Sequence, residues 1–221
     1  MYKILFIGIG KMGFPMAGFL SEKYEVSVYN RSKEKISIWK KKYKGNAVDN
    51  LNQLDEKFDF IISCIGNDDD LREITSNDTG CFNVIRKNTI FIDHSTVSPK
   101  IVQELELKLK EKEAFFLDAP ISGGQLGAEK GQLSIMVGGD KNAFNKSESI
   151  FEVYGKKRKY MGSSGSGQLT KIVNQICIAG LVQGLSESIY FMKQTKLNPE
   201  DVLDVISSGA AQSWQMDNRF M

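Results

Sequence analysis

Six residues close to the start of the chain, Gly8-Ile9-Gly10-Lys11-Met12-Gly13, restrict what this sequence can fold into more than any other stretch. An apolar run typical of a β-strand, Lys3–Gly8, leads into them, and a stretch with helical spacing of apolar residues, Gly13–Glu22, follows. The spacing Gly-x-Gly-x-x-Gly is a weak motif on its own. Between a strand and a helix it predicts a turn that binds the phosphates of a dinucleotide.

Each glycine of this turn has its own expected task. Gly8 permits the tight turn, Gly10 lets the backbone come close to a pyrophosphate, and Gly13 lets the helix pack closely on the strand. The N–H groups at the start of the helix would bind the phosphates. The alternative is a strand-to-helix turn that binds nothing.

Strand-like and helix-like stretches alternate along the first 162 residues. Alternation with about 30 residues per pair predicts a Rossmann-type α/β domain over residues 1–162, with a doubly wound, mostly parallel sheet and helices on both faces. The expected strands are Val26–Tyr29, a short one near Ala47–Val48, Phe58–Ile65, Thr89–Ile92, Ala114–Leu117 and Leu133–Val137, and the further helices are Glu34–Tyr43 and Pro99–Lys112.

Residues 163–221 show helical patterns without strand patterns, so we expect the start of a C-terminal all-α domain there. One long interdomain helix is predicted over residues 165–194. A shorter one is predicted over Pro199–Ser207, with Asn198 as its N-cap. Because the segment is short and the long helix is apolar, we expect that the chain is truncated or that a partner covers the helix.

The end of the second predicted strand bears on the choice of cofactor. An NAD site usually has an acidic residue there, whereas this chain has Asn30-Arg31-Ser32. Arg31 can pair with the 2′-phosphate of NADP, and Asn30 and Ser32 can donate hydrogen bonds to it. NADP is therefore favoured over NAD, the alternative being an ordinary surface arginine.

Composition and charge exclude several classes of function. The net charge is +2, so we expect neither a nucleic-acid nor a membrane partner, and no apolar run free of polar residues reaches the roughly 18 needed to span a membrane. Three scattered cysteines fit a reducing, cytoplasmic compartment, and no metal site is expected. The single histidine, His94, receives no role. The acidic run 68–70 resembles a metal cluster, but after a strand we expect it to cap a helix.

Two turns carry polar side chains after predicted strands. In Asp118-Ala119-Pro120-Ile121-Ser122-Gly123-Gly124, the Ser122 side chain and the glycine N–H groups can hold an anion such as a carboxylate. An ordinary tight turn explains the same residues equally well. In Asp93-His94-Ser95-Thr96, the hydroxyl groups can simply cap the next helix.

Lys171, Asn174 and Gln175 interrupt the long apolar helix, and Gln168 lies on the same helical face. A lysine whose stem is buried and whose amine faces a cleft would have a lowered pKa, which suits proton transfer. The alternative is that the amine extends along the surface to reach solvent. Spacing alone favours neither interpretation.

Four segments, GIGKMGFPMAGFL, DHSTVSP, DAPISGG and GSGQLTKIVNQ, occur in that order along the chain. In this order and spacing they resemble the β-hydroxyacid dehydrogenase family, which includes 3-hydroxyisobutyrate dehydrogenase, tartronate semialdehyde reductase and plant glyoxylate/succinic semialdehyde reductases. The resemblance runs from Met1 to the C-terminus. The family's members continue past position 221 and carry a further cofactor-contacting lysine there.

The resemblance implies a role for individual residues. Lys171 would be the catalytic lysine and Asn174 the asparagine that orients the lysine or the substrate. Gln175 replaces the second asparagine of many members, as in the tartronate semialdehyde reductase-like branch. The implied substrate-binding residues are Ser122, Gly123, Gly124 and Gln175, and the implied cofactor-binding residues are Gly8, Gly10, Lys11, Met12, Gly13, Asn30, Arg31, Ser32, Ile65 and Thr96.

The resemblance also implies an activity. We expect an NADP-dependent oxidoreductase, with NAD as the other candidate cofactor. It would transfer a hydride between NADPH and a small aldehyde-acid or β-hydroxyacid (3-hydroxyisobutyrate-like, tartronate, glyoxylate or succinic semialdehyde). The partners would be a small carboxylate substrate and further copies of the chain, in a dimer or tetramer. The alternatives are an imine reductase-like relative, against which Lys171 weighs, and a truncated module that binds NADP without turnover.

Overall fold

The computed structural model describes residues 1–54, 57–76 and 78–220. Two compact units, Met1–Lys171 and Ile172–Met221, divide the chain. The division falls inside one continuous helix, α7 (Ser166–Lys193).

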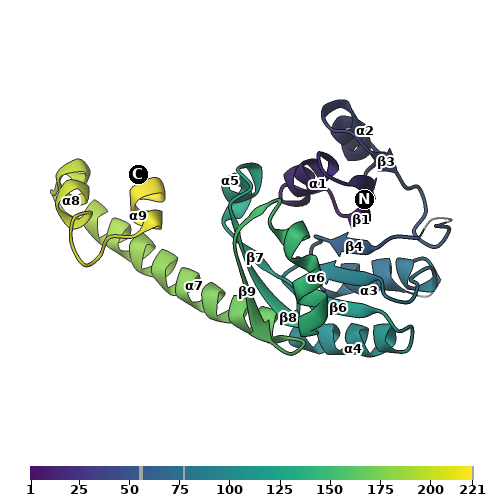
Figure 1. The fold of residues 1–221 in the computed structure, drawn as a ribbon. Helices are drawn as coiled ribbons and strands as arrows, with labels where there is room; N and C mark the ends of the chain where they lie inside the picture. The colour runs from purple at the N-terminus through teal and green to yellow at the C-terminus, as the bar shows by residue number, and fades with distance from the viewer. Residues whose placement is uncertain (55–56, 77, 221) are drawn as a thin grey trace. The chain divides into compact units, whose positions relative to one another are not determined.

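The first unit is built on one sheet (Figure 1). Within the described residues the strand order is β3-β2-β1-β4-β5-β6-β8-β7, with β9 paired to β8. The neighbours from β3 to β6 are parallel, β8 is antiparallel to β6 and β7, and β9 is parallel to β8. The predicted Rossmann-type, mostly parallel sheet is therefore confirmed. Its strands are β1 (Lys3–Ile7), β2 (Glu25–Tyr29), β3 (Asn46–Ala47), β4 (Phe60–Ser63), β5 (Ile90–Asp93), β6 (Phe115–Asp118), β7 (Ile121–Ser122), β8 (Leu133–Gly139) and β9 (Gly155–Gly162).

The central strands are almost continuously apolar because both faces of the sheet are covered. On β1, Ile4 and Phe6 belong to one hydrophobic cluster, and Leu5 and Ile7 belong to the other. Helices α1, α2, α5 and α6 contribute to the first cluster, and α3, α4 and a short 3-10 helix contribute to the second. The helices are α1 (Gly13–Ser21), α2 (Lys33–Lys42), α3 (Asp68–Thr75), η1 (Cys81–Asn83), α4 (Pro99–Lys110), α5 (Gly124–Glu129) and α6 (Lys141–Phe151).

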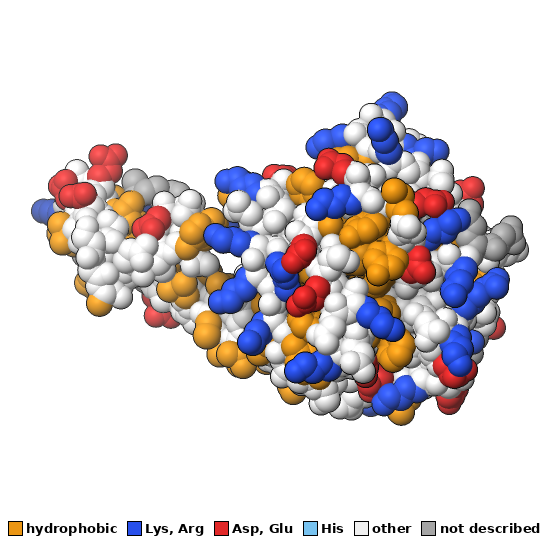
Figure 2. Space-filling model, in the orientation of Figure 1, with side chains coloured by type: hydrophobic (Ala, Val, Ile, Leu, Met, Phe, Trp, Pro, Cys, Tyr) orange, Lys and Arg blue, Asp and Glu red, His pale blue; other side chains and the backbone are white. Residues whose placement is uncertain are grey.

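The helices α5 and α6, the 3-10 helix η1 and the strands β7 and β9 were not predicted from the sequence. β9 has the sequence GKKRKYMG, whose run of basic residues hides any strand pattern. It forms by pairing with β8 at the edge of the sheet, with Lys156, Lys157 and Lys159 exposed. Figure 2 shows Lys and Arg side chains gathered on the face that β9 and α6 present. At the opposite edge, β3 has only two residues, both exposed.

The second unit is helical, as predicted. It contains most of α7, α8 (Pro199–Ile206) and α9 (Trp214–Arg219), which pack around Met192, Met216 and Phe220. Asn198 caps α8 as expected, because its Oδ1 accepts a hydrogen bond from the Glu200 N–H at 2.9 Å.

Helix α7 is long and apolar. By length and composition alone it could cross a membrane, the one such helix found in the part of the chain that the structure describes. Apolar side chains gather along it (Figure 2), and Val173 and Ile176 are 62% and 67% exposed. A single helix of this kind is weak evidence for a membrane, because core helices of soluble proteins pass the same test.

Candidate active site

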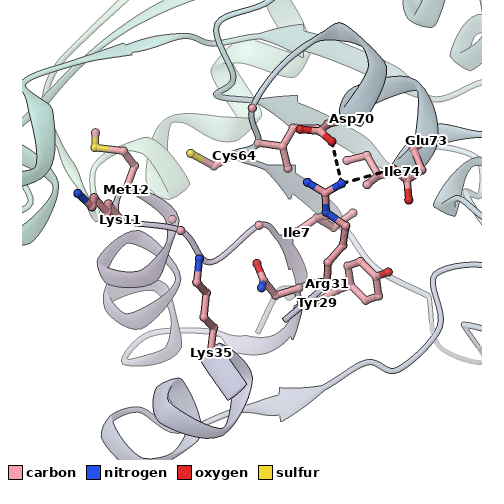
Figure 3. Close-up of a pocket in the computed structure, with 16 residues that line it drawn as sticks. Ile7, Lys11, Met12, Tyr29, Arg31, Lys35, Cys64, Asp70, Glu73 and Ile74 are labelled. Carbon is pink, nitrogen blue, oxygen red and sulfur yellow. Dashed lines mark ion pairs between the residues drawn. The ribbon is translucent and has the colours of Figure 1, made fainter. Parts of the chain in front are cut away.

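A pocket of about 370 Å³ lies at the carboxyl ends of β1, β2 and β4 (Figure 3). Ligands of doubly wound sheets bind at this edge, and the volume suits a small molecule. The glycine turn, the end of β2, the first turn of α2, the loop after β4 and α3 supply its walls. The lining residues are Ile7, Gly8, Gly10, Lys11, Met12, Gly13, Tyr29, Asn30, Arg31, Lys35, Cys64, Ile65, Gly66, Asp70, Glu73 and Ile74.

The three glycines of the turn differ in whether the surrounding structure leaves room for a side chain. Gly8 has φ +94°, and a Cβ there would lie 2.4 Å from the Cys64 carbonyl oxygen. A Cβ on Gly13 would lie 2.1 Å from the Gly8 carbonyl oxygen, so packing excludes a side chain at both positions. A Cβ on Gly10 would meet no described atom within 4 Å. The fold therefore does not require a glycine at position 10. A ligand that comes close to the backbone there would require one.

Helix α1 begins at this turn without neutralising groups. Its N-cap, Met12, makes no side-chain capping hydrogen bond, and its first turn contains no acidic residue. The partial positive charge of the helix N-terminus is therefore available to an anion. Together with the space at Gly10, this fits the pyrophosphate of a dinucleotide.

After β2, two of the residues predicted to bind the 2′-phosphate, Asn30 and Arg31, have different partners. The Asn30 side chain is engaged within the chain: its Oδ1 accepts from the Ile9 N–H at 3.2 Å, and its Nδ2 donates to the Ser32 carbonyl oxygen at 3.3 Å. Asn30 thus ties the glycine turn to β2. Arg31 faces the pocket and pairs with Asp70, with Nη1 and Oδ1 2.9 Å apart.

Sequence reasoning missed Lys35, a second cation that lines the pocket (Figure 3). It lies in the first turn of α2, which begins shortly after Arg31, and a basic residue so close to the end of β2 is the signal that could have found it. Of the predicted cofactor residues, Ile65 lines the pocket, whereas Ser32 and Thr96 do not. Cys64 also lines it, but burial, and then the nearby Asp93, raise the pKa of its thiol to about 12, so it is no thiolate nucleophile.

Lys171 and the predicted substrate turn meet in the first unit. The Lys171 Nζ donates to the Ile121 carbonyl oxygen at 2.8 Å, one residue before Ser122. Lys171 is only 8% exposed, and burial lowers the pKa of its amine. The amine therefore does not reach out into solvent. Gly123 and Gly124, with φ of +134° and +60°, shape the turn beside it.

Two buried side chains hold the start of α7, and with it Lys171, against the sheet. The Asp118 carboxylate accepts the Gly165 N–H and the Gln168 N–H, each at 2.8 Å. Gln168 bridges to the loop after β5, donating to the Ser95 carbonyl oxygen at 2.8 Å and accepting the Val97 N–H at 3.2 Å. Burial raises the pKa of Asp118 to about 6, which the two N–H donors counteract.

Asn174 and Gln175 follow Lys171 by three and four residues on α7 and belong to the second unit. The Asn174 amide donates to the Gln175 Oε1 at 3.1 Å. Their roles toward lysine and substrate stay predictions.

His94 belongs to the core. Its Nδ1 lies 2.6 Å from the Ala119 carbonyl oxygen and its Nε2 lies 2.9 Å from the Tyr154 hydroxyl. Since a carbonyl only accepts, Nδ1 carries the proton and Nε2 accepts from the hydroxyl. Burial lowers the pKa of His94 to about 4, so the ring is neutral.

Asp93 orders the loop that leads to the pocket. Its Oδ1 accepts from the Ser63 and Ser95 hydroxyl groups at 2.7 and 2.6 Å, and the Ser95 Oγ accepts the Ile65 N–H at 3.0 Å. Burial raises the pKa of this carboxyl group. Ile65 is thus placed at the pocket wall by Ser95, which the last residue of β5 holds in turn.

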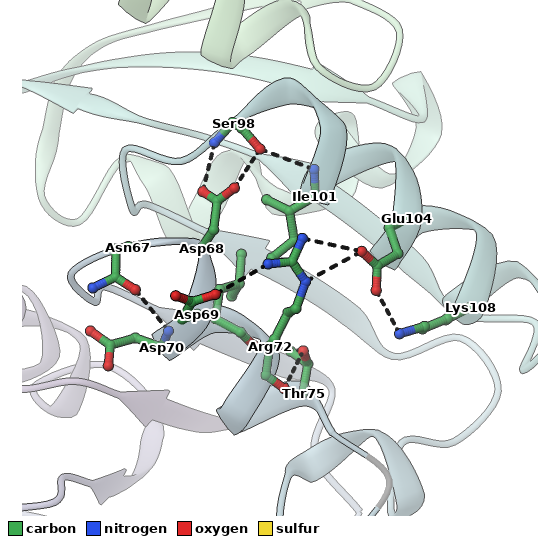
Figure 4. Close-up of polar contacts among 11 residues, drawn as sticks. Asn67, Asp68, Asp69, Asp70, Arg72, Thr75, Ser98, Ile101, Glu104 and Lys108 are labelled. Carbon is green, nitrogen blue, oxygen red and sulfur yellow. Dashed lines mark hydrogen bonds and ion pairs between the residues drawn. The ribbon is translucent and has the colours of Figure 1, made fainter.

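The acidic run after β4 forms the first turn of α3 and does not cap it. Asn67 is the cap, because its Oδ1 accepts the Asp70 N–H at 2.9 Å (Figure 4). Each carboxylate has a separate partner. Asp68 accepts from the Ser98 N–H at 2.9 Å and from its hydroxyl, Asp69 lies 3.4 Å from Arg72, and Asp70 pairs with Arg31.

Two family models match the chain. The NAD binding domain of 6-phosphogluconate dehydrogenase matches residues 3–162, and the domain described as NAD-binding of NADP-dependent 3-hydroxyisobutyrate dehydrogenase matches residues 165–221. The chain belongs to the 3-hydroxyisobutyrate dehydrogenase-like β-hydroxyacid dehydrogenase family. The resemblance noted in the sequence is confirmed, and the protein is an NAD(P)-dependent oxidoreductase of this family.

Three members of this dehydrogenase family illustrate how similar the chain is to known proteins. An uncharacterized oxidoreductase of Shewanella frigidimarina is 44% identical over 221 residues, which cover 100% of this chain and 76% of the relative. The 2-hydroxy-3-oxopropionate reductase of Escherichia coli is 31% identical over 215 residues, covering 96% of this chain and 72% of that protein. The structure of Mycobacterium tuberculosis 3-hydroxyisobutyrate dehydrogenase with L-serine has a TM-score of 0.86 at 24% identity, covering 100% of this chain and 75% of that one, and shows the shared fold.

Proposed function

We propose that this dehydrogenase is an NADPH-dependent reductase of small aldehyde-acids, with the reverse oxidation of a β-hydroxyacid as the same reaction run backwards. One observation carries the proposal: the buried Lys171 amine lies against the backbone of Ile121, directly before the Ser122–Gly124 turn. The contact supports a role for Lys171 as proton donor next to a turn that would bind the carboxylate, which is the arrangement that reduction of a carbonyl beside a carboxylate requires.

The choice of NADP is supported by the end of β2. Asn30-Arg31-Ser32 directly after the strand contains no carboxylate, while Arg31 and Lys35 line the pocket there. The pocket's glycine turn and α1 would hold the pyrophosphate, and the two cations would hold a 2′-phosphate. When bound, NADPH would supply the hydride. NAD is the second candidate cofactor.

The chain's own residues would perform the rest. The Ser122 hydroxyl and the glycine N–H groups would bind the substrate carboxylate. Lys171 would donate a proton to the oxygen of the carbonyl as its charge develops, and would take that proton back in the oxidative direction. Asn174 would orient the lysine or the substrate. Burial lowers the pKa of Lys171, which is the direction that favours proton transfer by its amine.

The test is NADPH consumption with glyoxylate, succinic semialdehyde and tartronate semialdehyde, for the wild type and for Lys171→Met. We expect Lys171→Met to lower turnover about 10²- to 10⁴-fold while NADPH binding is kept. Lys157→Met, which removes an exposed lysine of β9, is the matched control and should leave turnover unchanged. In the wild type, reduction should slow and oxidation should quicken as pH rises through the pKa of Lys171.

Near-normal turnover of Lys171→Met would refute the assignment of the proton donor. NADPH binding without turnover of any aldehyde-acid would favour the alternative, a module that binds NADP only.

The proposal includes self-association as a dimer or tetramer. Its support is the exposed apolar side chains of α7 in the second unit. A monomer in sedimentation experiments at micromolar concentration would contradict it.

A further inference from the structure

The pocket wall opposite Arg31 carries two carboxylates. Asp70 and Glu73, both on α3, line the pocket together with Arg31 and Lys35 (Figure 3). The Arg31 Nη1 lies 2.9 Å from the Asp70 Oδ1 and 3.7 Å from the Glu73 Oε2. Lys35 forms no ion pair with any residue that the structure describes.

The Asp70 carboxylate is held in place by the fold. Its side chain is only 20% exposed, whereas that of Arg31 is 67% exposed. The residue lies in the first turn of α3, where the helix dipole favours a negative charge. A Cβ on Gly66 would come within 2.7 Å of the Asp70 Oδ2, so the absence of a side chain at Gly66 makes room for this carboxylate. Arg31 is the more exposed member of the pair, so it has more room than Asp70 to turn toward a ligand.

We infer that Asp70 sets the cofactor selectivity of this pocket by competing with the 2′-phosphate of NADP for Arg31. With NAD, which has no such phosphate, the Asp70–Arg31 pair can stay intact. With NADP, Arg31 must exchange the carboxylate for the phosphate, and a group with about two negative charges enters beside Asp70 and Glu73. Asp70 thus lowers the preference for NADP that Arg31 and Lys35 create.

This inference rests on the proposed cofactor pocket and is tested by binding, not turnover. Dissociation constants of NADP⁺ and NAD⁺ are measured calorimetrically for the full chain and for Asp70→Asn. We expect the ratio Kd(NAD⁺)/Kd(NADP⁺) to rise about 3- to 5-fold in Asp70→Asn, the range for a charge pair that is partly exposed to solvent. The difference in this ratio between Asp70→Asn and the wild type should become smaller as the salt concentration is raised from about 0.05 to about 0.5 M, because salt screens the charges.

Two further variants control for effects unrelated to Arg31. Asp69→Asn removes the same charge from the same helical turn, but its side chain is 97% exposed and pairs with Arg72 outside the pocket. It should change the ratio less than 2-fold, roughly the limit for an exposed charge of this kind. Glu73→Gln should change the ratio by an amount between those of Asp70→Asn and Asp69→Asn, because the Glu73 carboxylate is farther from Arg31 than that of Asp70 is.

An unchanged or lowered ratio in Asp70→Asn, with melting behaviour like that of the wild type, would overturn the inference, as would an equal rise in Asp69→Asn. Failure of the wild type to bind either dinucleotide would instead overturn the proposed pocket itself. The two failures are therefore distinguishable.

Discussion

Substitution of Gly10 separates the requirements of the fold from those of the cofactor. A methyl group there meets no described atom within 4 Å, and Gly10 is not among the glycines with positive φ. Gly10→Ala should therefore fold normally. Alanine restricts the unfolded chain more than glycine does, which stabilises a compatible site by about 0.4–1 kcal/mol. For a chain of this size the melting temperature should rise by roughly 1–4 °C.

Cofactor binding should respond in the opposite direction. The methyl group occupies the place where the backbone would contact a pyrophosphate. Overpacking of a closely fitted contact costs about 1–3 kcal/mol, which corresponds to a roughly 5- to 150-fold rise in the dissociation constant of NADPH. Thermal melting without ligand and a calorimetric titration with NADPH measure the two effects on one sample.

Gly13→Ala is the matched comparison, because it adds the same methyl group three residues later. Here the Cβ would lie 2.1 Å from the Gly8 carbonyl oxygen and 2.9 Å from the Phe6 ring. We expect a loss of about 3 kcal/mol or more of folding stability. NADPH binding by Gly10→Ala equal to that of the wild type, or a melting temperature as low as that of Gly13→Ala, would refute this assignment of Gly10.

Two further predictions concern the core and a helix cap. Because burial lowers the pKa of His94 to about 4, the unfolded chain takes up a proton between about pH 6.5 and pH 4 that the folded chain does not. Stability relative to His94→Gln should therefore fall by about 3 kcal/mol over that range in urea titrations, and a pH-independent difference would contradict this. Asp118, whose raised pKa gives the opposite slope, is common to both proteins and drops out of the comparison. Asp140 accepts the Ala143 N–H at 2.8 Å at the start of α6, so Asp140→Ala should cost about 1 kcal/mol and Asp140→Ser much less; equal melting temperatures for the two variants would argue against a capping role.

The parts of the site that depend on local spacing were predictable from the sequence. Gly13 is required by contacts with Gly8 and Phe6 in the same strand and turn, and Gly8 by its φ of +94° in that turn, so the glycine spacing between a strand pattern and a helix pattern predicts both. Lys35 could have been found in the same way, because it lies in the first turn of the helix that begins shortly after Arg31.

Contacts between distant segments were not predictable. Helical spacing could not decide whether the Lys171 amine reaches solvent or lies in a cleft. The contact that decides this is with the Ile121 carbonyl oxygen, 50 residues away in the sequence. The pairing of Arg31 with Asp70 likewise joins two segments that are distant in the sequence, the residues after β2 and helix α3. The acidic run after β4 could be placed at a helix start, but only the fold gives each carboxylate its partner.

The two edges of the sheet bear on how this protein would aggregate. An unpaired edge strand can form backbone hydrogen bonds with a strand of another chain, and long apolar edge strands do so most readily. Here one edge strand has two residues, and the other carries the run Lys156-Lys157-Arg158-Lys159. Like charges would oppose the approach of a second copy to that edge. Association through exposed α7 side chains would therefore precede fibril-like growth, and precipitates should retain native helical content.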